Sequence, residues 1–538
     1  MPSQTTQTHS DRKNSSAVTT KSGARQTWVR FVVPSAADLL FVALLLGLSC
    51  GAMGGLLLRD SDIGWHIRDG QQILLTHATT RTDSFSSTMS GHTWYAWEWL
   101  YDVLIAAIDH VFGLNGVVFF TAAVVAATFA LSLKFALLRG GNLAVTFFLL
   151  ILSLGASAVH FLARPHVLSW LFVVIWFELL DSDASAHQAS QRLLWLPVMM
   201  AVWVNLHGGF VLGFLLVAVY LIGGAIEYVI NPEQRRRIAG WLKYLGGIAA
   251  LTLVASFINP YSYHLHLHIY RYLSDRFLMS QISEFLSPDF HGAAQQCFAV
   301  LLIVAIATPA VIRRGLSASR LLVLLFAAYS GLYATRNLPT SALLITLVIA
   351  PVLSTAIGQA TGNPKIVSWL RQLLSGISSF GFRMQRLDSD LRGHVLTILV
   401  LAIGVWACWH QGRIGSIELM NAHFDESRFP VKASNYIAGH GVHEPIFSLD
   451  YWGGYLIYRL YPETKVVVDD RHDLYGDQFI KNYLKIVLVQ PTFAEELDQM
   501  KINWVLVPRW SSLANVLRLT RNWTVVFEDG NAALFRRN

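Results

Sequence analysis

The chain has 538 residues, of which 54% are hydrophobic and 14% are charged, and its mean hydropathy is +0.44. This composition excludes an ordinary soluble protein and indicates a polytopic membrane protein. A net charge of +7 would suit a nucleic-acid partner, but the basic residues fall in short loops between apolar runs. Nucleic-acid-binding proteins carry a stripe of basic residues with interleaved aromatic residues, and this sequence has none. We therefore expect no nucleic-acid partner.

Residues 1–34 are polar, basic and rich in serine and threonine, which predicts a disordered cytoplasmic N-terminus. The apolar run Ala36–Leu58 that follows is long enough to cross a bilayer as one helix. A cleaved signal peptide has a shorter charged region and a shorter apolar core, so we expect a retained anchor.

We expect the functional site in the segment 59–99, which directly follows this run. Its ionisable residues include Asp60, Asp62, His66, Arg68, Asp69 and Glu98. Ionisable groups at a membrane exit indicate function, and the aromatic stretch Trp94–Trp99 suits the level of the lipid headgroups. The alternative is a solvated loop in which Asp60 and Asp62 cap the following helix.

Hydropathy predicts about ten further spans, so that residues 35–410 form a transmembrane domain of about eleven helices. The further spans are Leu114–Leu137, Leu143–Phe161, His166–Leu180, Leu193–Asn205, Gly208–Val229, Tyr244–Ile258, Gln296–Ile312, Arg320–Ala334, Leu338–Ile357 and His394–His410. The run Glu98–Phe112 carries several charges and is more typical of an amphipathic interfacial helix.

The distribution of basic residues predicts the topology. With the N-terminus inside, the inside loops hold Arg139, Arg192, Arg235, Arg236, Arg237, Lys243, Arg313, Arg314, Arg320, Lys365, Arg371, Arg383, Arg386 and Arg392. This agrees with the positive-inside rule and places residues 411–538 outside the cytoplasm.

The unusual polar clusters then fall at the outer ends of the spans, which indicates a pocket at one membrane face. A transporter would place such groups near the midplane. We expect Arg164, His166, His207 and Arg336 to bind a phosphate, although each could instead snorkel at the interface. Other candidate pocket residues are His66, Arg68, Asn205, Asn259, Glu284, Asp289, His291 and Asn337.

Carboxylate and imidazole ligands also make a divalent cation such as Mg²⁺ or Mn²⁺ a candidate cofactor at Asp60, Asp62 and His66. No spacing in this segment is diagnostic of a metal. The sequence HLHLH at 264–268 would align its histidines only on a strand, and we expect a helix there, on which the three do not share a face.

The motifs DSDIGWHIRDG, TRTDSFS, WYAWEW, WVNLHGGF, INPY, SPDFH and ATRNLP resemble those of a large group of bacterial membrane proteins of the GT-C glycosyltransferase type, related to the protein mannosyltransferases and the aminoarabinose transferases. The resemblance covers most of residues 35–350 and continues into the C-terminal domain. It implies a polyprenyl-phosphate-linked or polyprenyl-diphosphate-linked sugar donor and an acidic base or metal ligand in the first outer loop. Asp62 is the first candidate, followed by Asp60 and Glu98. The Asp-Glu pair of the mannosyltransferases is replaced here by Asp-Ser-Asp, which leaves the choice of base open.

Residues 421–538 alternate short strands with helices, which predicts a small α/β domain. The predicted strands are Ile446–Leu449, Lys465–Asp469, Trp504–Val507, Val525–Glu528 and Ala532–Phe535, and the predicted helices include Tyr455–Leu460, Gln478–Val489 and Phe493–Met500. Ligands bind beyond the carboxyl ends of parallel strands. The candidate acceptor-side residues are therefore Asp450, Tyr451, Trp452, Asp469, Asp470 and Arg471, unless these are only turn residues.

Together these patterns predict an α-helical polytopic membrane protein of the GT-C type with a C-terminal extracytoplasmic α/β domain. The predicted function is transfer of a sugar from a polyprenyl-phosphate-linked donor to a glycan, lipid or protein acceptor outside the bacterial cytoplasmic (inner) membrane. The alternatives are a glycolipid transporter or flippase and a non-catalytic glycan-binding assembly protein.

Overall fold

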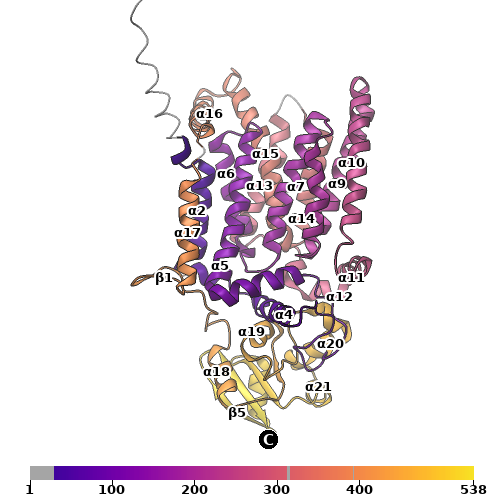
Figure 1. The fold of residues 1–538 in the computed structure, drawn as a ribbon, viewed down its shortest axis with the longest axis vertical. Coiled ribbons are helices and arrows are strands. Elements are labelled where there is room, and N and C mark those ends of the chain that lie inside the picture. Colours follow the sequence, from indigo (N-terminus) through magenta and orange to yellow (C-terminus); the bar gives the residue numbers. More distant parts are fainter. Residues whose placement is uncertain (1–29, 52, 312–314, 392) are drawn as a thin grey trace, which may run out of the picture.

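The computed structural model describes residues 30–51, 53–311, 315–391 and 393–538. Roughly parallel helices form a bundle, and the chain ends in a mixed helix and strand region at one end of it (Figure 1). Most of the predicted N-terminus, residues 1–29, lies outside the described part, as do Arg313, Arg314 and Arg392 of the topology prediction and Ile312, the last residue of a predicted span.

Six helical stretches are long and apolar enough to cross a membrane, and three shorter apolar helices accompany them within the described residues. The bundle contains α2 (Ala36–Ser49), α5 (Trp99–Leu138), α6 (Leu143–Ser157), α7 (His166–Ala186), α8 (Trp195–Trp203), α9 (Val211–Ile230), α10 (Arg235–Ala255), α13 (Ala293–Val311), α14 (Ala318–Tyr333), α15 (Leu338–Thr361) and α17 (Val395–Trp409). The chain is thus a multi-pass, mostly helical membrane protein, and the count of about eleven spans stays a prediction.

Two helix boundaries depend on glycine. The prediction of one helix over Ala36–Leu58 is wrong, because α2 ends at Ser49 and Gly51 adopts a φ of +64°, which breaks the helix before the short α3 (Met53–Leu56). In α5, Gly113 has a φ of +61° and separates the segment predicted as interfacial from the following apolar segment. The first part of α5 lies across the end of the bundle (Figure 1).

Buried ion pairs hold the bundle together at the end of α5. Asp181 of α7 accepts hydrogen bonds from Arg320 of α14 at 2.9 and 3.0 Å and pairs with Arg139 at 3.3 Å. Arg139 also pairs with Glu178. Two of the arginines that the topology prediction counted as loop charges therefore serve as internal contacts between helices.

The C-terminal region contains one mixed sheet with the strand order β3-β4-β6-β5. The pair β3–β4 is parallel and the other two pairs are antiparallel. The elements are β1 (Arg413–Ile414), β2 (Ile417–Glu418), α18 (Val431–Gly439), β3 (Ile446–Ser448), α19 (Asp450–Leu460), α20 (His472–Val487), α21 (Phe493–Gln499), β4 (Trp504–Pro508), α22 (Ser512–Leu519), β5 (Trp523–Glu528) and β6 (Ala532–Arg537).

The predicted strand Lys465–Asp469 is wrong. This segment makes only isolated bridges, in which Val466 pairs with Ile446 and with Ser86. The Val466 N–H donates to the Phe85 carbonyl, and the Val466 carbonyl accepts from the Ser87 N–H. The segment therefore lies between β3 and a loop of the N-terminal half, which local sequence could not reveal.

Close backbone packing fixes the C-terminal region against the outer loop. Helix α4 (Asp62–Thr76) packs on α19, and a Cβ at Gly64 would lie 2.2 Å from the Gly454 carbonyl oxygen. A Cβ at Gly454 would lie 2.4 Å from the Ser61 carbonyl oxygen. Only glycines allow this approach, which brings the start of α4 beside residues 469–473.

Candidate functional site

A cavity of about 450 Å³ lies where α4, the start of α5 and the ends of several bundle helices meet the segment 470–473. Its apolar wall comes from α9, α11 (Tyr263–Ser274) and α14 and includes Leu212, Leu215, Ile269, Leu273 and Phe326. Its charged and imidazole groups are Asp62, Glu98, Asp102, His160, Arg164, His166, His207, Glu284, Arg336, Asp470, Arg471 and Asp473. The cavity therefore joins an apolar surface to a dense set of charges.

Arg164 is the central cation of this set. It lies in the turn before α7 and contacts Asp62 at 2.7 Å, Glu284 at 2.9 Å and Asp60 at 3.1 Å. Burial acts to raise the pKa of Glu284, but Arg164 and Arg336 together hold this pKa below its ordinary value. The Arg164 guanidinium thus forms ion pairs with three carboxylates, two from the start of α4 and one from residue 284.

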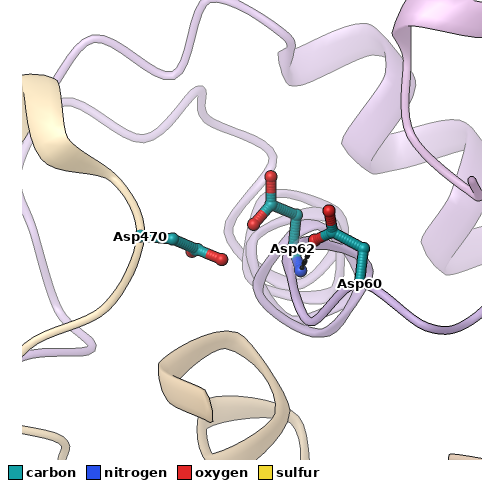
Figure 2. A group of neighbouring side chains, drawn as sticks. All are labelled: Asp60, Asp62 and Asp470. Carbon is teal, nitrogen blue, oxygen red and sulfur yellow. Dashed lines mark hydrogen bonds between the residues drawn. The ribbon is translucent and has the colours of Figure 1, made fainter. Parts of the chain in front are cut away.

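Asp60, Asp62 and Asp470 form a compact acidic group, with one carboxylate oxygen from each lying within 4.8 Å of the others. Figure 2 shows Asp60 and Asp62 at the start of α4 with Asp470 reaching toward them from the C-terminal region. Burial and mutual repulsion raise the pKa of Asp60 to about 7 and that of Asp62 well above its ordinary value. Burial likewise raises the pKa of Asp470 to about 6. Burial, the largest cause of each shift, disfavours the charged form of all three carboxylates.

His66, predicted as a third metal ligand beside Asp60 and Asp62, points elsewhere. Its Nδ1 lies 2.5 Å from a carboxylate oxygen of Asp102, and its Nε2 lies 3.8 Å from Glu98. Burial, with Arg164 nearby, lowers the pKa of His66 well below its usual range, so the ring is neutral. The histidine therefore belongs to a buried pair behind the cavity wall, and Asp470 takes the place expected for it.

Glu98 lies between two imidazoles at the cavity wall. His207 Nε2 lies 3.7 Å from Glu98, while His207 Nδ1 accepts a hydrogen bond from the Gly209 N–H at 3.0 Å. The Nε2 atom therefore carries the proton and faces Glu98. Burial raises the pKa of Glu98 to about 8, and burial beside Arg336 lowers the pKa of His207 to about 3. At neutral pH both groups are uncharged.

The remaining predicted phosphate ligands also reach the cavity. Arg336 lies over the Phe285 ring at 4.3 Å, and among the described residues no carboxylate lies within ion-pair distance of it. His166 Nε2 donates to the His160 carbonyl at 2.9 Å, which fixes the ring at the cavity edge. Asn337 lines the same side and donates to the Ser330 carbonyl.

Arg471 lines the cavity and also forms buried ion pairs behind it. It binds Asp469 at 2.7 Å and Asp83 at 2.8 Å, and its guanidinium lies over the Trp94 ring at 4.5 Å. Asp469 itself does not line the cavity. This pair joins the C-terminal region to the outer loop through fully buried charges.

The other predicted site residues do not line the cavity, namely Arg68, Asn205, Asn259, Asp289, His291, Asp450, Tyr451 and Trp452. Arg68 donates to the Tyr458 carbonyl, and Asp289 and His291 form an exposed pair. Asp450 is held by His472 at 2.9 Å and by Tyr483 at 3.0 Å. Asn205 and Asn259 donate to backbone carbonyls, and Trp452 is buried.

His160 and Tyr272 line the cavity but are not among the predicted site residues. His160 lies four residues before Arg164, and Tyr272 lies one helical turn after His268, so both could have been found by their spacing. The prediction for 264–268 is confirmed, because α11 is a helix and its histidines diverge. His266 contacts Ser256 at 2.9 Å and His268 contacts Asp473 at 3.3 Å.

No protein-family model and no curated protein sequence matches the chain. Its fold is similar to that of the apo oligosaccharyltransferase of Archaeoglobus fulgidus, with a TM-score of 0.53 and 11% identity over 88% of this chain and 68% of that chain. The archaeal oligosaccharyltransferase AglB from Archaeoglobus fulgidus, solved with an inhibitory peptide and a dolichol-phosphate, gives a TM-score of 0.55 and 11% identity over 93% and 73%. ArnT from Cupriavidus metallidurans gives a TM-score of 0.48 and 13% identity over 95% and 98%. The chain therefore has a fold similar to that of the two archaeal oligosaccharyltransferase structures.

Proposed function

We propose that the protein is an integral membrane glycosyltransferase that moves a sugar from a polyprenyl-phosphate-linked donor to an acceptor on the extracytoplasmic face. The observation that carries the proposal is the cavity, in which three arginines, buried carboxylates and an apolar wall meet. Such a site suits a ligand with an anionic head and a hydrocarbon tail. The AglB structure holds a dolichol-phosphate, a ligand of this chemistry.

The donor phosphate would bind Arg164 and Arg336, with the Nε2–H of His207 as a further hydrogen-bond donor. His166, whose ring N–H already donates to the His160 carbonyl, would border the phosphate without donating to it. Arg336 has no carboxylate partner within the described residues, so it is available to an anion. The prenyl chain would run along Leu212, Leu215 and Phe326 of α9 and α14. A phosphate bound in this way would lie at the end of the bundle, away from the midplane expected for a transporter.

Asp62 is the first candidate for the base, because it lines the cavity and lies 2.7 Å from the arginine proposed to hold the phosphate. The acceptor hydroxyl would give its proton to Asp62, its oxygen would bond to the anomeric carbon, and the bond from that carbon to the phosphate oxygen would break. The polyprenyl phosphate leaves with the bonding electron pair. Asp60 and Glu98 remain the other candidates for this role.

A divalent cation suits the acidic group. Arg164 contacts Asp60 and Asp62, whereas Asp470 makes no ion pair among the described residues, so the three clustered carboxylates outnumber the one guanidinium beside them. Oxygen ligands of this kind bind Mg²⁺ or Mn²⁺. When bound, the ion would supply positive charge to the departing phosphate. His66 is not among the proposed ligands, because Asp102 holds it elsewhere.

We further propose that residues 35–410 form the transmembrane domain and that residues 421–538 form an extracytoplasmic α/β domain that closes the cavity from the acceptor side. Asp470, Arg471 and Asp473 support this role because they line the cavity. Asp450, Tyr451 and Trp452 would then support these residues from behind. The host membrane is the bacterial cytoplasmic membrane.

The direct test is a transfer assay in proteoliposomes with a panel of polyprenyl-phosphate-linked sugars. We expect protein-dependent release of polyprenyl phosphate from at least one donor, and its loss when Arg164 is replaced by methionine. Asp289→Asn is the matched control, since its exposed carboxylate lies outside the cavity and should leave release unchanged. Movement of intact glycolipid across the bilayer without any release would contradict the proposal and favour a flippase.

A further inference from the structure

Helix α16 (Ser368–Ser389) differs in direction from the rest of the bundle. It is seen nearly end-on in Figure 1, at the end of the bundle opposite the C-terminal region, while its neighbours run lengthwise. Asn142 donates to the Ser378 carbonyl at 2.9 Å, and Gln385 donates to the Leu137 carbonyl at 3.2 Å. A Cβ at Gly381 would lie 1.8 Å from Asn142 Oδ1, so this glycine lets the helix sit directly on the bundle.

The side of α16 that meets the bundle is only part of its apolar surface. A second set of apolar side chains is exposed to solvent. The exposed fractions are 64% for Trp369, 53% for Leu373, 55% for Phe380, 39% for Met384 and 63% for Leu387. At 3.6 residues per turn these five residues fall within an arc of about 60°, roughly a quarter turn from Gly381. They form one continuous apolar stripe that points sideways from the bundle.

Basic residues border this stripe. Arg383 and Arg386 follow it on the side away from the bundle, and Lys365 and Arg371 lie near the start of the helix. Of the neighbouring acids, Asp388 accepts the Ala36 N–H at 2.5 Å and Asp390 pairs with Arg30 at 3.7 Å. Within the residues that the structure describes, no carboxylate pairs with Arg371, Arg383 or Arg386. The helix thus has a bundle side, an apolar side and a cationic side.

We propose that α16 lies in the plane of the membrane and binds anionic phospholipids of the leaflet opposite the catalytic cavity. The apolar stripe would enter the boundary between headgroups and acyl chains, as amphipathic interfacial helices do. Arg383 and Arg386 would contact the lipid phosphates, since anionic leaflets attract basic residues beside the membrane. The observations that select lipid as the occupant are the sideways direction of the stripe, at the end of a membrane-spanning bundle, and the arginines without carboxylate partners.

The depth of α16 can be measured on the full-length protein in nanodiscs. Nitroxide labels at Leu387→Cys and Gln372→Cys would report, by power-saturation EPR, their contact with oxygen in the acyl region and with a nickel chelate in water. We expect the label at 387 to favour oxygen and the label at 372 to favour the chelate. Equal exposure of both labels to the chelate would overturn the proposal.

The charge preference needs a separate measurement. Native mass spectrometry of the detergent-purified protein would compare binding of phosphatidylglycerol and phosphatidylcholine. We expect preferential retention of phosphatidylglycerol, reduced at least about fivefold by the double change Arg383→Gln and Arg386→Gln. Arg413→Gln, which removes an exposed arginine paired with Glu418 beyond the last bundle helix, is the matched control. Unchanged retention in the double variant would contradict the assignment of these arginines as headgroup ligands.

Discussion

Arg164 neutralises fewer charges than the cavity contains. Its guanidinium contacts Asp60, Asp62 and Glu284 within 3.1 Å, while Asp470 adds a further, half-buried carboxylate. Arg164 and Arg336 hold the pKa of Glu284 low, whereas Asp60 and Asp62 keep raised pKa values because burial and repulsion exceed the effect of one arginine. The acidic group is therefore prepared to accept a proton or a cation.

Asp62→Asn should reduce turnover by about 10²–10⁴-fold, the usual contribution of a general base. The amide is nearly isosteric but cannot take the acceptor proton. Steady-state release of polyprenyl phosphate would measure the effect, and donor binding should persist because Arg336 is unchanged. A wild-type rate would show that Asp62 only caps α4, and would move the search to Asp60 or Glu98.

Glu98→Gln should change the pH dependence of stability. Because burial raises the folded-state pKa of Glu98 to about 8, from the usual 4.5, the folded protein retains this proton while the unfolded chain loses it. The contribution of Glu98 to the free energy of unfolding therefore decreases as pH rises from about 4.5 to about 8. Above that pH it changes no further. The melting temperature of Glu98→Gln should exceed that of the wild type by a margin that grows across this range and then levels off. A constant margin from pH 5 to pH 9 would contradict the burial argument.

Several site residues could be predicted from local sequence. Asp60, Asp62, Arg164, His207 and Glu98 stand out because each is ionisable or polar beside an apolar run. Their partners could not be predicted in the same way. His66 pairs with Asp102, 36 residues away, and Asp62 faces Asp470 from the other end of the chain. Periodicity carries no information about such distant pairs.

At the scale of elements, the packing of α4 on α19 holds Asp60 and Asp62 close to Asp470. Gly64→Ala would place a Cβ 2.2 Å from the Gly454 oxygen and 2.9 Å from Tyr458 Cβ, so the helices would have to separate. We expect a loss of about 1–3 kcal/mol in stability, with a larger fall in turnover because Asp470 moves away from Asp62. Thermal unfolding and the release assay would measure both effects.

Gly47→Ala is the matched control for this prediction. Gly47 lies within α2, and a Cβ there meets no other atom within 4 Å. Alanine is the better helix former, so this variant should be at least as stable as the wild type. Equal behaviour of the Gly64 and Gly47 variants would show that the contact between α4 and α19 does not position the site.

Element types were more predictable than their ends. Strands β3, β4, β5 and β6 match predicted strands because each has a strong pattern of apolar and β-branched residues. The error at Lys465–Asp469 has a different cause, since that segment finds its partners in Phe85 and Ser87. The end of α2 was missed because hydropathy does not register the left-handed backbone of Gly51.

At the scale of the whole molecule, the orientation in the membrane decides on which side the chemistry occurs. Arg139 and Arg320 are engaged in ion pairs within the bundle, so the orientation rests more heavily on Arg192, on Arg235–Arg237 and on the basic residues of α16. We expect a periplasm-active reporter fused after Asn538 to be active and one fused near Gln234 to be silent. The reverse pattern would move the cavity to the cytoplasmic side.

The central claim is that the cavity binds the phosphate of a polyprenyl lipid. A cryo-EM map of the protein in nanodiscs with added polyprenyl phosphate tests this most directly. We predict density for the phosphate within hydrogen-bond distance of Arg164 and Arg336, with the prenyl chain along the wall formed by α9 and α14. A bound phosphate at another surface, with the cavity free of lipid density, would contradict the account.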